Sequence, residues 1–434
     1  MKNPLVRFVG VFAFVCLSLL VSGQNLHYFF LDNVYQRSYF NPALNDEGNF
    51  AVASGLGLDI STTGPSVADI TSKNDEGVLI VSAQDAISGM NEFNDIFGYT
   101  SVNTLDVSIN TPFVRISAGH AWKAQAWMQY TRDLAELVTF GNSGFIGETM
   151  DLSLQIDYIN YNEVYLGFQK SFGPVNVGTR IKRLSGVETI VTDEHKIDLT
   201  TSDDIYQLTM DTDFELRSSR AFDYTDIENF EFNVESISLD NFMKNNGGWA
   251  LDLGASMDIG DRLEVSLGII DIGSIKWDVE PRTYRSSKVQ TFDGIDVSDY
   301  ITSDEEFVIL DSLEALLDLT ETNEEFSTRL PVRIYLGGIL KLNDMWSVGA
   351  LIQSSGVSDR RPNILSLNAT AKISGLLSVG ALYSVKSGNP ANLGLLTSLN
   401  IGPVTGFLST DNFLLLGSFK NKNTNIRAGL SIRI

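Results

Sequence analysis

The chain has 434 residues, with 54 acidic and 31 basic side chains and a formal net charge of −23. This excess of negative charge excludes nucleic acid as a partner, because its phosphates would be repelled. The length fits either two or three soluble domains or one large barrel.

Residues 1–23 have the features of a secretory signal peptide. Lys2 and Arg7 precede the apolar run Phe8–Val21, and small residues up to Gly23 supply a cleavage site. The single cysteine, Cys16, lies inside this segment. The mature chain therefore has no cysteine for disulfides, thiolate metal sites or nucleophilic catalysis. No later run of about 18 apolar residues predicts a membrane-spanning helix.

Residues 24–48 form a lead rich in aromatic side chains, "QNLHYFFLDNVYQRSYFNPAL" at 24–44. Proline fixes its own φ and restricts the residue before it, so Asn41-Pro42-Ala43 predicts a fixed turn into a first strand at 49–60. We expect the lead on the periplasmic side or inside a barrel. It either fills the base of the barrel or acts as a plug for gating or partner docking.

Several stretches alternate apolar and polar residues over about ten positions: "GWALDLGASMDIG", "GLLSVGALYSVK", "ANLGLLTSLNIG" and "NIRAGLSIRI". This period is required of a strand with lipid on one side and a lumen on the other. A soluble β-sandwich alternates as well. The signal peptide, the lack of cysteine and the alternation up to Ile434 favour the barrel. The sequence predicts an all-β fold, a single antiparallel transmembrane β-barrel of about 14 strands over 49–434.

Short and long connections alternate along the chain. Turn residues predict tight periplasmic turns at 172–174, 260–261, 343–344, 374–375 and 402–403. Long extracellular loops are expected near 191–247 and 279–329, as in outer-membrane barrels. Reading 412–423 as a loop keeps the C-terminus on the periplasmic side.

The two long segments are acidic, with 27 of the 54 acids between them. Asp211, Asp213 and Glu215 alternate, so an extended strand would direct them to one side. Such oxygen ligands are weak candidates for a calcium site, and a solvated repelling surface is the plainer interpretation. Ser303 with Glu306 makes a capping box, which predicts a short loop helix over 303–319 with an apolar stripe.

The C-terminal strand gives the register of the barrel wall. We expect the outward positions to contact lipid and Arg427 and Arg433 to face the lumen or the interface. Trp249 and Trp277 are expected at the outer membrane interface, and Trp346 at the periplasmic one. The outward positions are Ile426, Ala428, Leu430, Ile432 and Ile434.

Catalytic signals are absent from the sequence. His27, His120 and His195 are widely separated and lack metal-ligand spacing. No nucleophile elbow, P-loop, EF-hand or zincin motif is present. We expect neither an enzyme nor a resident cofactor.

Stretches such as "YFNPAL", "YNEVYLGFQKSFGPVNVGTRIKRLSG" and "RLPVRIYLGG" resemble a Bacteroidota family of outer-membrane barrels without assigned function. That family is similar in style to the FadL and PorP/SprF porin-like barrels. The resemblance implies an outer-membrane location and two alternative functions. One is a channel or transporter for small or hydrophobic solutes, through a lumen or a lateral opening. The other is a non-conducting scaffold for surface-protein secretion, anchoring or adhesion, with surface or periplasmic protein partners.

Overall fold

The structure is a computed structural model. None of its described helices is long and apolar enough to cross a bilayer. The predicted signal peptide, most of the predicted 303–319 helix and most of the 412–423 loop lie outside the described residues. The described residues are 27–32, 34–44, 48–73, 79–203, 207–224, 230–232, 246–292, 317–356, 363–386, 392–413 and 422–434.

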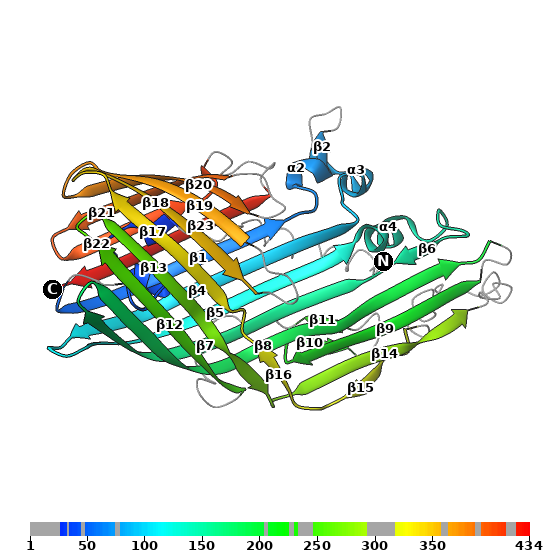
Figure 1. The fold of residues 1–434 in the computed structure, drawn as a ribbon. Helices are drawn as coiled ribbons and strands as arrows, with labels where there is room; N and C mark the ends of the chain where they lie inside the picture. Colours follow the sequence, from blue (N-terminus) through cyan, green and yellow to red (C-terminus); the bar gives the residue numbers. More distant parts are fainter. Residues whose placement is uncertain are drawn as a thin grey trace.

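Fourteen antiparallel strands close into one barrel, which confirms the predicted fold class and strand count (Figure 1). The first strand pairs with the last along 51–61 and 423–433, so the sheet has no free edge there. In chain order the wall consists of β1 (Phe50–Thr62), β4 (Phe93–Asn110), β5 (Arg115–Thr131), β7 (Leu154–Phe172), β8 (Val175–Thr201), β12 (Gly247–Ile259), β13 (Leu263–Trp277), β17 (Arg333–Lys341), β18 (Trp346–Ser355), β19 (Asn363–Lys372), β20 (Leu377–Lys386), β21 (Asn392–Ile401), β22 (Val404–Thr410) and β23 (Asn423–Arg433).

The predicted tight turns lie at one rim of the barrel, each between two neighbouring wall strands. Gly173, Gly260 and Gly402 occupy three of them with φ values of 62°, 61° and 62°. This left-handed conformation is readily available to glycine because it has no Cβ. Ile434 also lies at this rim, where its carbonyl oxygen accepts hydrogen bonds from the backbone of Asn49 and Phe50.

The outer face of the barrel carries exposed apolar side chains, as the period-two pattern predicts. On β23, Leu430 is 63% exposed while Arg427 is buried on the lumen side. The predicted orientation of this strand is therefore confirmed at both positions. Trp249 and Trp346 are exposed as expected, but Trp277 is fully buried. The prediction for Trp277 is wrong, because β16 (Phe326–Arg329) pairs with the end of β13 and Phe326 stacks on the indole.

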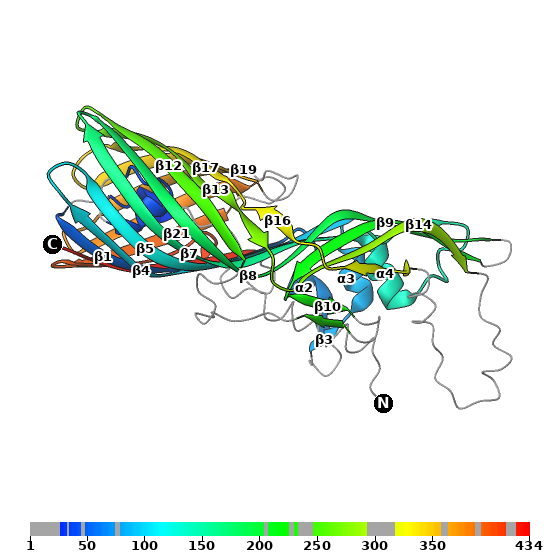
Figure 2. The ribbon, with the colours of Figure 1, turned by 90° about the horizontal axis from the view of Figure 1, so that it is seen from below.

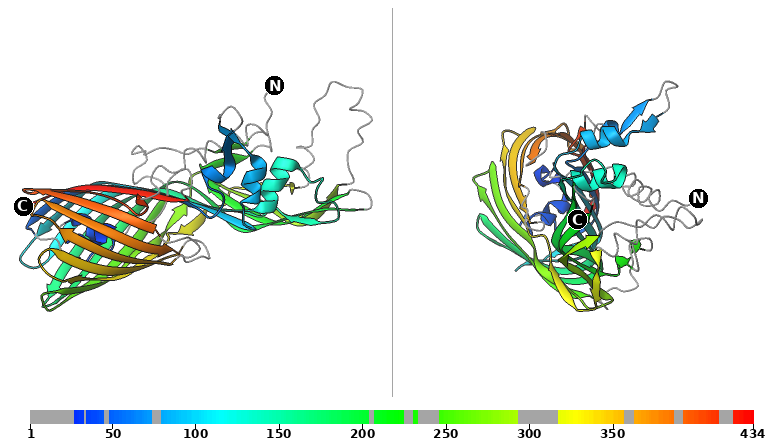
Figure 3. Two further views of the ribbon diagram at one scale, coloured as in Figure 1. Left: turned by 90° about the horizontal axis from the view of Figure 1, so that it is seen from above. Right: turned by 90° about the vertical axis from the view of Figure 1, so that its right-hand side faces the viewer.

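The lead enters the barrel and fills part of the lumen (Figures 2 and 3). It forms two short 3-10 helices, η1 (His27–Phe30) and η2 (Tyr35–Tyr39), followed by the Asn41-Pro42-Ala43 turn. We call residues 27–44 the plug. Its aromatic side chains, among them Phe29 and Phe40, belong to a buried cluster with lumen-facing residues of the wall such as Leu351.

One side of the wall continues beyond the rim opposite the tight turns (Figure 2). Strand β12 begins opposite Ser185, so the remainder of the 27-residue strand β8 runs past the barrel. We call this extension the projecting sheet. It contains the distal parts of β7 and β8 together with β6 (Thr149–Asp151), β9 (Leu208–Ser219), β14 (Pro281–Phe292) and β15 (Thr320–Thr322).

The projecting sheet corrects the expectation of two long loops. The 191–247 and 279–329 segments contain strands, and β9 pairs with β14 along the whole of β14. The reason is visible in the sequence, because the acids of β9 alternate with Met210, Thr212 and Leu216, which are buried. The pattern that directs the acids to one face is itself a strand pattern.

Small elements flank the projecting sheet in Figure 1. Of these, helix α4 (Arg132–Phe140) packs with Leu134 and Leu137 against a buried cluster that includes Met150 and Leu199. This helix covers one face of the sheet with apolar side chains. The flanking elements are α2 (Val67–Ile70), β2 (Thr71–Lys73), β3 (Leu79–Val81), α3 (Ala83–Ser88), α4 (Arg132–Phe140), β10 (Phe222–Tyr224) and β11 (Phe230–Phe232).

Candidate functional site

The Asn-Pro-Ala turn of the plug rests on a row of glycines in the wall. Gly178, Gly254 and Gly268 lie side by side on β8, β12 and β13. A Cβ atom on any of them would overlap atoms of residues 40–43. The row therefore gives the plug backbone a close approach to the wall that only glycine allows.

Hydrogen bonds fix this turn against the wall. The Asn41 side chain donates from Nδ2 to the Ala255 carbonyl oxygen at 2.9 Å, and its Oδ1 accepts from the Ala43 amide at 2.8 Å. The Ala43 carbonyl oxygen accepts from Gln169 Nε2 at 3.0 Å and Ser256 Oγ at 3.1 Å. The Asn41-Pro42-Ala43 segment, which the sequence predicts only as a turn, thus anchors the plug to the wall.

The rest of the plug is held by side chains and not by strand pairing. Gln36 Nε2 donates to the carbonyl oxygens of Ser54 and Leu430, both at 2.9 Å. Arg37 forms an ion pair with Glu264 of β13 and donates from Nε to the Phe29 carbonyl oxygen at 2.8 Å. In the described part of the chain, no plug residue takes part in the pairing of the barrel strands. The wall is therefore complete without the plug.

Buried tyrosines join the plug to the middle of the lumen. Tyr39 of the plug and Tyr165 of β7 both donate to Asp106 of β4, each at 2.5 Å. The Arg180 guanidinium lies 4.7 Å from the centre of the Tyr165 ring. Asp106 thus receives hydrogen bonds from the plug and from the wall at the same time.

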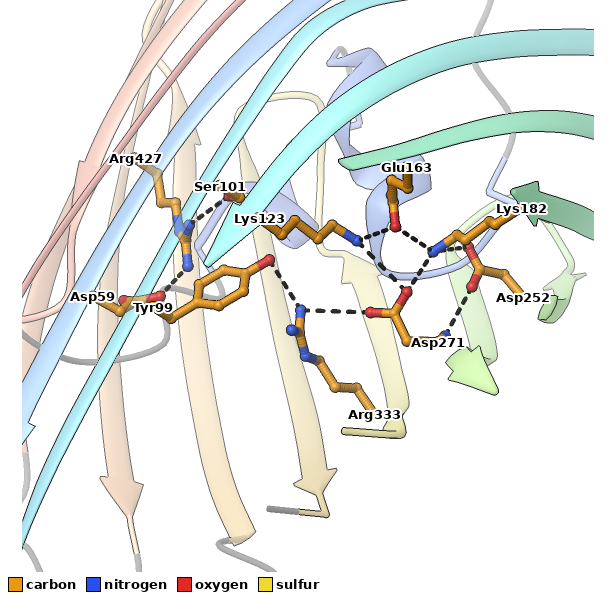
Figure 4. A network of polar contacts seen from close by, with 10 residues as sticks. All are labelled: Asp59, Tyr99, Ser101, Lys123, Glu163, Lys182, Asp252, Asp271, Arg333 and Arg427. Atoms are coloured by element: carbon orange, nitrogen blue, oxygen red, sulfur yellow. Dashed lines mark hydrogen bonds and ion pairs between the residues drawn. The ribbon is translucent and has the colours of Figure 1, made fainter. Parts of the chain in front are cut away.

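Next to the plug, a belt of charged side chains crosses the lumen (Figure 4). The belt residues come from nine neighbouring wall strands, from β23 through β1 to β17, and are almost completely buried. We call this group the lumen belt. It consists of Asp59, Tyr99, Ser101, Lys123, Glu163, Lys182, Asp252, Asp271, Arg333 and Arg427.

Two lysines share the acids of the belt. Lys182 Nζ lies 2.5 Å from Asp271, 2.8 Å from Asp252 and 3.5 Å from Glu163. Lys123 Nζ lies 2.9 Å from Glu163 and 3.5 Å from Asp271. Buried charges of this kind are tolerated only when they are paired in this way.

Asp271 owes its position to an irregularity in the wall. The register between β12 and β13 shifts between Leu251 and Leu253, and Asp271 adopts a φ of 66°. Its amide donates to Asp252 Oδ1 at 2.8 Å. A bulge re-aims a side chain, and non-glycine residues with positive φ cluster at functional sites. Here the bulge places the Asp271 carboxylate among Lys123, Lys182 and Arg333.

One belt contact joins opposite sides of the barrel. Arg333 of β17 donates from Nη1 to the Tyr99 hydroxyl of β4 at 3.2 Å, and its guanidinium lies 4.5 Å from the ring centre. At least five wall strands separate β4 from β17 in either direction. Nearby, Arg427 pairs with Asp59 and donates to Ser101 Oγ at 3.3 Å. The belt therefore bridges the lumen between β4 and β17.

A small cavity remains between the plug and the belt. Its volume is about 70 Å³, and Tyr28, Gln36, Phe40, Gln353 and Arg333 are among the residues that line it. On the scale of this volume one buried water needs about 10–15 Å³, so the cavity has room for several water molecules. The filled lumen is what we regard as the candidate functional site.

The candidate calcium ligands lie far from this site, on the projecting sheet. Asp211 contacts Lys196 Nζ at 2.5 Å, and Glu215 pairs with Arg285. Among the described residues, no group of three metal-ligating side chains is placed to hold a metal ion. Calcium binding by Asp211, Asp213 and Glu215 stays a prediction.

The structure does not gather the histidines. His120 lies on barrel strand β5, with Nδ1 2.8 Å from Thr104 Oγ1, and His195 lies on the projecting sheet. The belt residues that sequence reasoning missed carried one signal. Asp252 and Arg333 are charged residues at inward positions of alternating strands, where small polar residues would have sufficed.

The chain belongs to DUF5723, a family of unknown function, whose model matches residues 42–411. A comparison with curated proteins finds no match. Solved structures give distant similarities. The Ralstonia pickettii toluene transporter TbuX is 11% identical, with 91% of this chain and 92% of that chain covered and a TM-score of 0.44.

Two further structures show similarity of the same kind. The Pseudomonas putida toluene transporter TodX is 10% identical, with 92% of both chains covered and a TM-score of 0.42. A Pseudomonas aeruginosa FadL homologue is 11% identical, with 93% of this chain and 94% of that chain covered and a TM-score of 0.41.

Proposed function

We propose that the protein is a porin-like transporter of small or hydrophobic solutes in the outer membrane, closed in this state by its plug and lumen belt. The observation that carries the proposal is that the 14-strand wall closes on itself without the plug. The plug can therefore leave without breaking any strand pairing. A lumen lined by polar and charged groups remains behind it, as in barrels that conduct.

Opening requires two separate changes. The plug must give up the Asn41 anchor and the Arg37–Glu264 ion pair. The belt must also separate at the Arg333–Tyr99 contact, which joins opposite sides of the lumen. The exposed apolar face of the wall supports a location in a membrane, since large exposed apolar patches mark contacts with lipid or with a partner protein.

Planar-bilayer recording of the purified protein tests the proposal. We expect the wild-type barrel to be silent for most of the time. A variant that lacks residues 24–44 and also carries Tyr99→Ala, which removes the Arg333–Tyr99 contact, should conduct steadily. Arg37→Met should raise the opening frequency, because it removes the plug's ion pair. Arg183→Met is the matched control, since Arg183 lies over the Trp249 ring on the outer face.

A second candidate is a non-conducting scaffold for surface or periplasmic proteins. The filled lumen and the long projecting sheet favour it, because neither is needed to pass a solute. If the variant that lacks residues 24–44 and carries Tyr99→Ala folds and remains silent, the transporter proposal fails and the scaffold takes its place. Recovery of the wild-type protein in the soluble periplasmic fraction would contradict both.

A further inference from the structure

The projecting sheet has two edges that differ in how they are covered. On the β6 side, the amide of Asp151 donates to Asp133 Oδ2 of α4 at 2.9 Å, and its carbonyl oxygen accepts from Thr131 Oγ1 at 2.5 Å. On the other side, β15 covers β14 only at 283–285. In the described part of the chain, residues 286–292 therefore have β9 as a strand partner on one side and none on the other (Figure 1). We call residues 286–292 the β14 edge.

Two side-chain hydrogen bonds show which backbone groups of β14 point away from β9. Thr320 Oγ1 of β15 donates to the Arg285 carbonyl oxygen at 3.0 Å, whereas Thr212 Oγ1 of β9 donates to the Lys288 carbonyl oxygen at 3.2 Å. Successive residues of an antiparallel strand direct their N–H and C=O groups to alternate sides. Odd-numbered residues of β14 therefore direct these groups outward. Within the β14 edge they are Ser287, Val289 and Thr291.

An open strand edge is a template for an added strand, and folded proteins usually block such edges. The β14 edge contains one charged residue, Lys288, and that residue is held by an ion pair with Asp318. Val289 is exposed and Ser287 is small. Side chains of the edge therefore leave its outward backbone groups open to an extended segment, which would gain main-chain hydrogen bonds.

The charge of the neighbouring face favours one kind of segment. Asp213 lies opposite Ser287 on one side and Lys196 on the other. Lys196 pairs with Asp211, so Asp213 is left without an ion pair among the described residues. On this face of β8, β9 and β14, six acids stand against three bases, an excess of three negative charges. They are Asp193, Glu194, Asp198, Asp211, Asp213 and Glu215 against Lys196, Arg217 and Arg285.

We propose that the β14 edge binds an extended segment of a partner protein as one further strand, with basic and apolar side chains in alternation. A basic side chain opposite Ser287 can extend past the small serine to Asp213. The alternate side chains lie on the other face, where Phe292 packs against the apolar cluster that includes Met210. This binding is separate from transport and does not rest on it.

A second copy of the chain in the same membrane does not fit this edge. The projecting strands continue the barrel wall (Figure 2). Antiparallel pairing of two β14 edges reverses the direction of these strands, so the second barrel would be inverted. The partner is therefore a different protein.

Binding of a synthetic peptide to the full mature chain in nanodiscs of zwitterionic lipid tests the proposal. The probe is a fluorescent Val-Lys-Val-Lys-Val-Lys-Val peptide, and the control is the same peptide with Glu in place of Lys. Fluorescence anisotropy should show saturable binding of the Lys peptide and none of the Glu peptide. Absence of Lys-peptide binding, or equal binding of both peptides, overturns the proposal.

Val289→Pro shows whether the peptide binds at the edge. Proline removes an outward N–H and leaves the bonds to β9 in place, so the affinity should fall about tenfold. Val289→Thr is the matched control, because it keeps both the N–H and a β-branched side chain. Unchanged affinity in Val289→Pro means that the peptide binds elsewhere by charge alone and contradicts the proposal.

Hydrogen exchange of the wild-type chain gives a test that needs no variant. The amides of Ser287, Val289 and Thr291 should exchange rapidly in the protein alone and slowly when the Lys peptide is bound. The amides of Lys288 and Gln290, which point to β9, should be slow in both states. Slow exchange at the three outward amides without peptide would mean that the chain already covers this edge, and the proposal would fail.

Discussion

The lumen belt and the projecting sheet contain the same kind of ion pair in opposite surroundings. In the belt, Lys182 is 2% exposed and Asp271 fully buried, with their charged atoms 2.5 Å apart. On the projecting sheet, Lys196 and Asp211 stand 2.5 Å apart but are 48% and 43% exposed. The distance between the charged atoms therefore does not show which pair contributes more to stability. Water screens the second pair, whereas the first has only its partners to replace lost solvation.

The largest effect is expected when a belt charge loses its partner. Lys182→Met should destabilise the barrel by about 3–5 kcal/mol, because it leaves Asp252 and Asp271 buried with less compensation. Urea titrations in lipid vesicles, read by heat-modifiable migration on gels, give the change in unfolding free energy. Lys196→Met is the control on the projecting sheet, where no measurable change is expected. Equal effects at the two lysines would remove the contrast between the regions.

The next contrast uses exposed apolar residues, which the proposed membrane location places against lipid on the barrel and against water on the projecting sheet. Leu430→Arg should cost about 2–4 kcal/mol near the bilayer midplane. Val289→Arg, at a residue that is 65% exposed on β14, should be harmless. Assembly yield and the same urea titration measure both variants. A tolerated Leu430→Arg would mean that β23 does not face lipid.

A smaller effect is expected at the glycine row, where the wall meets the plug. Gly254→Ala places a methyl group against Asn41 and Pro42, and overpacking of this kind costs about 1–3 kcal/mol. We expect that cost to appear as loosening of the plug, measured by faster hydrogen exchange over 35–44. Gly98→Ala is the matched control, because nothing lies within 4 Å of the added atom. Unchanged exchange in Gly254→Ala would mean that the row does not hold the plug.

The last effect concerns pH and the projecting sheet. Burial, with the nearby charge of Asp193, raises the pKa of Asp157 to about 6. The folded state then holds this proton more tightly than the unfolded chain does. Stability is full below about pH 4, falls as the pH rises to about 6, and is constant above that. The rise of about two pKa units corresponds to a loss of about 3 kcal/mol.

Proteolysis at a series of pH values should show this change within 150–220. Asp157→Asn should abolish it, because the side chain no longer ionises. Asp213→Asn serves as the control, since Asp213 is exposed on the same sheet. A sheet whose protection does not change between pH 4 and 7 would contradict the raised pKa.

Local sequence patterns determined the wall of this protein. Alternation of single residues predicts which face of a strand meets lipid, and Leu430 and Arg427 lie on the expected faces. Turn residues predict the tight connections because a turn is also local: the φ preference of glycine shapes only the two or three residues around it. The prediction of long loops is wrong for part of the acidic segments, because the acids of β9 alternate with the buried side chains of Met210, Thr212 and Leu216.

Only the tertiary structure decided what fills the lumen. Asp59, Lys182 and Arg333 are far apart in the sequence, and closure of the barrel brings them into one belt. Strand register likewise brings Gly178, Gly254 and Gly268 side by side beneath one turn of the plug, and this placement is not visible in the sequence. Sequence periodicity fixes the direction of each side chain. The residue it meets across the lumen depends on strand number and stagger, which are properties of the closed sheet as a whole.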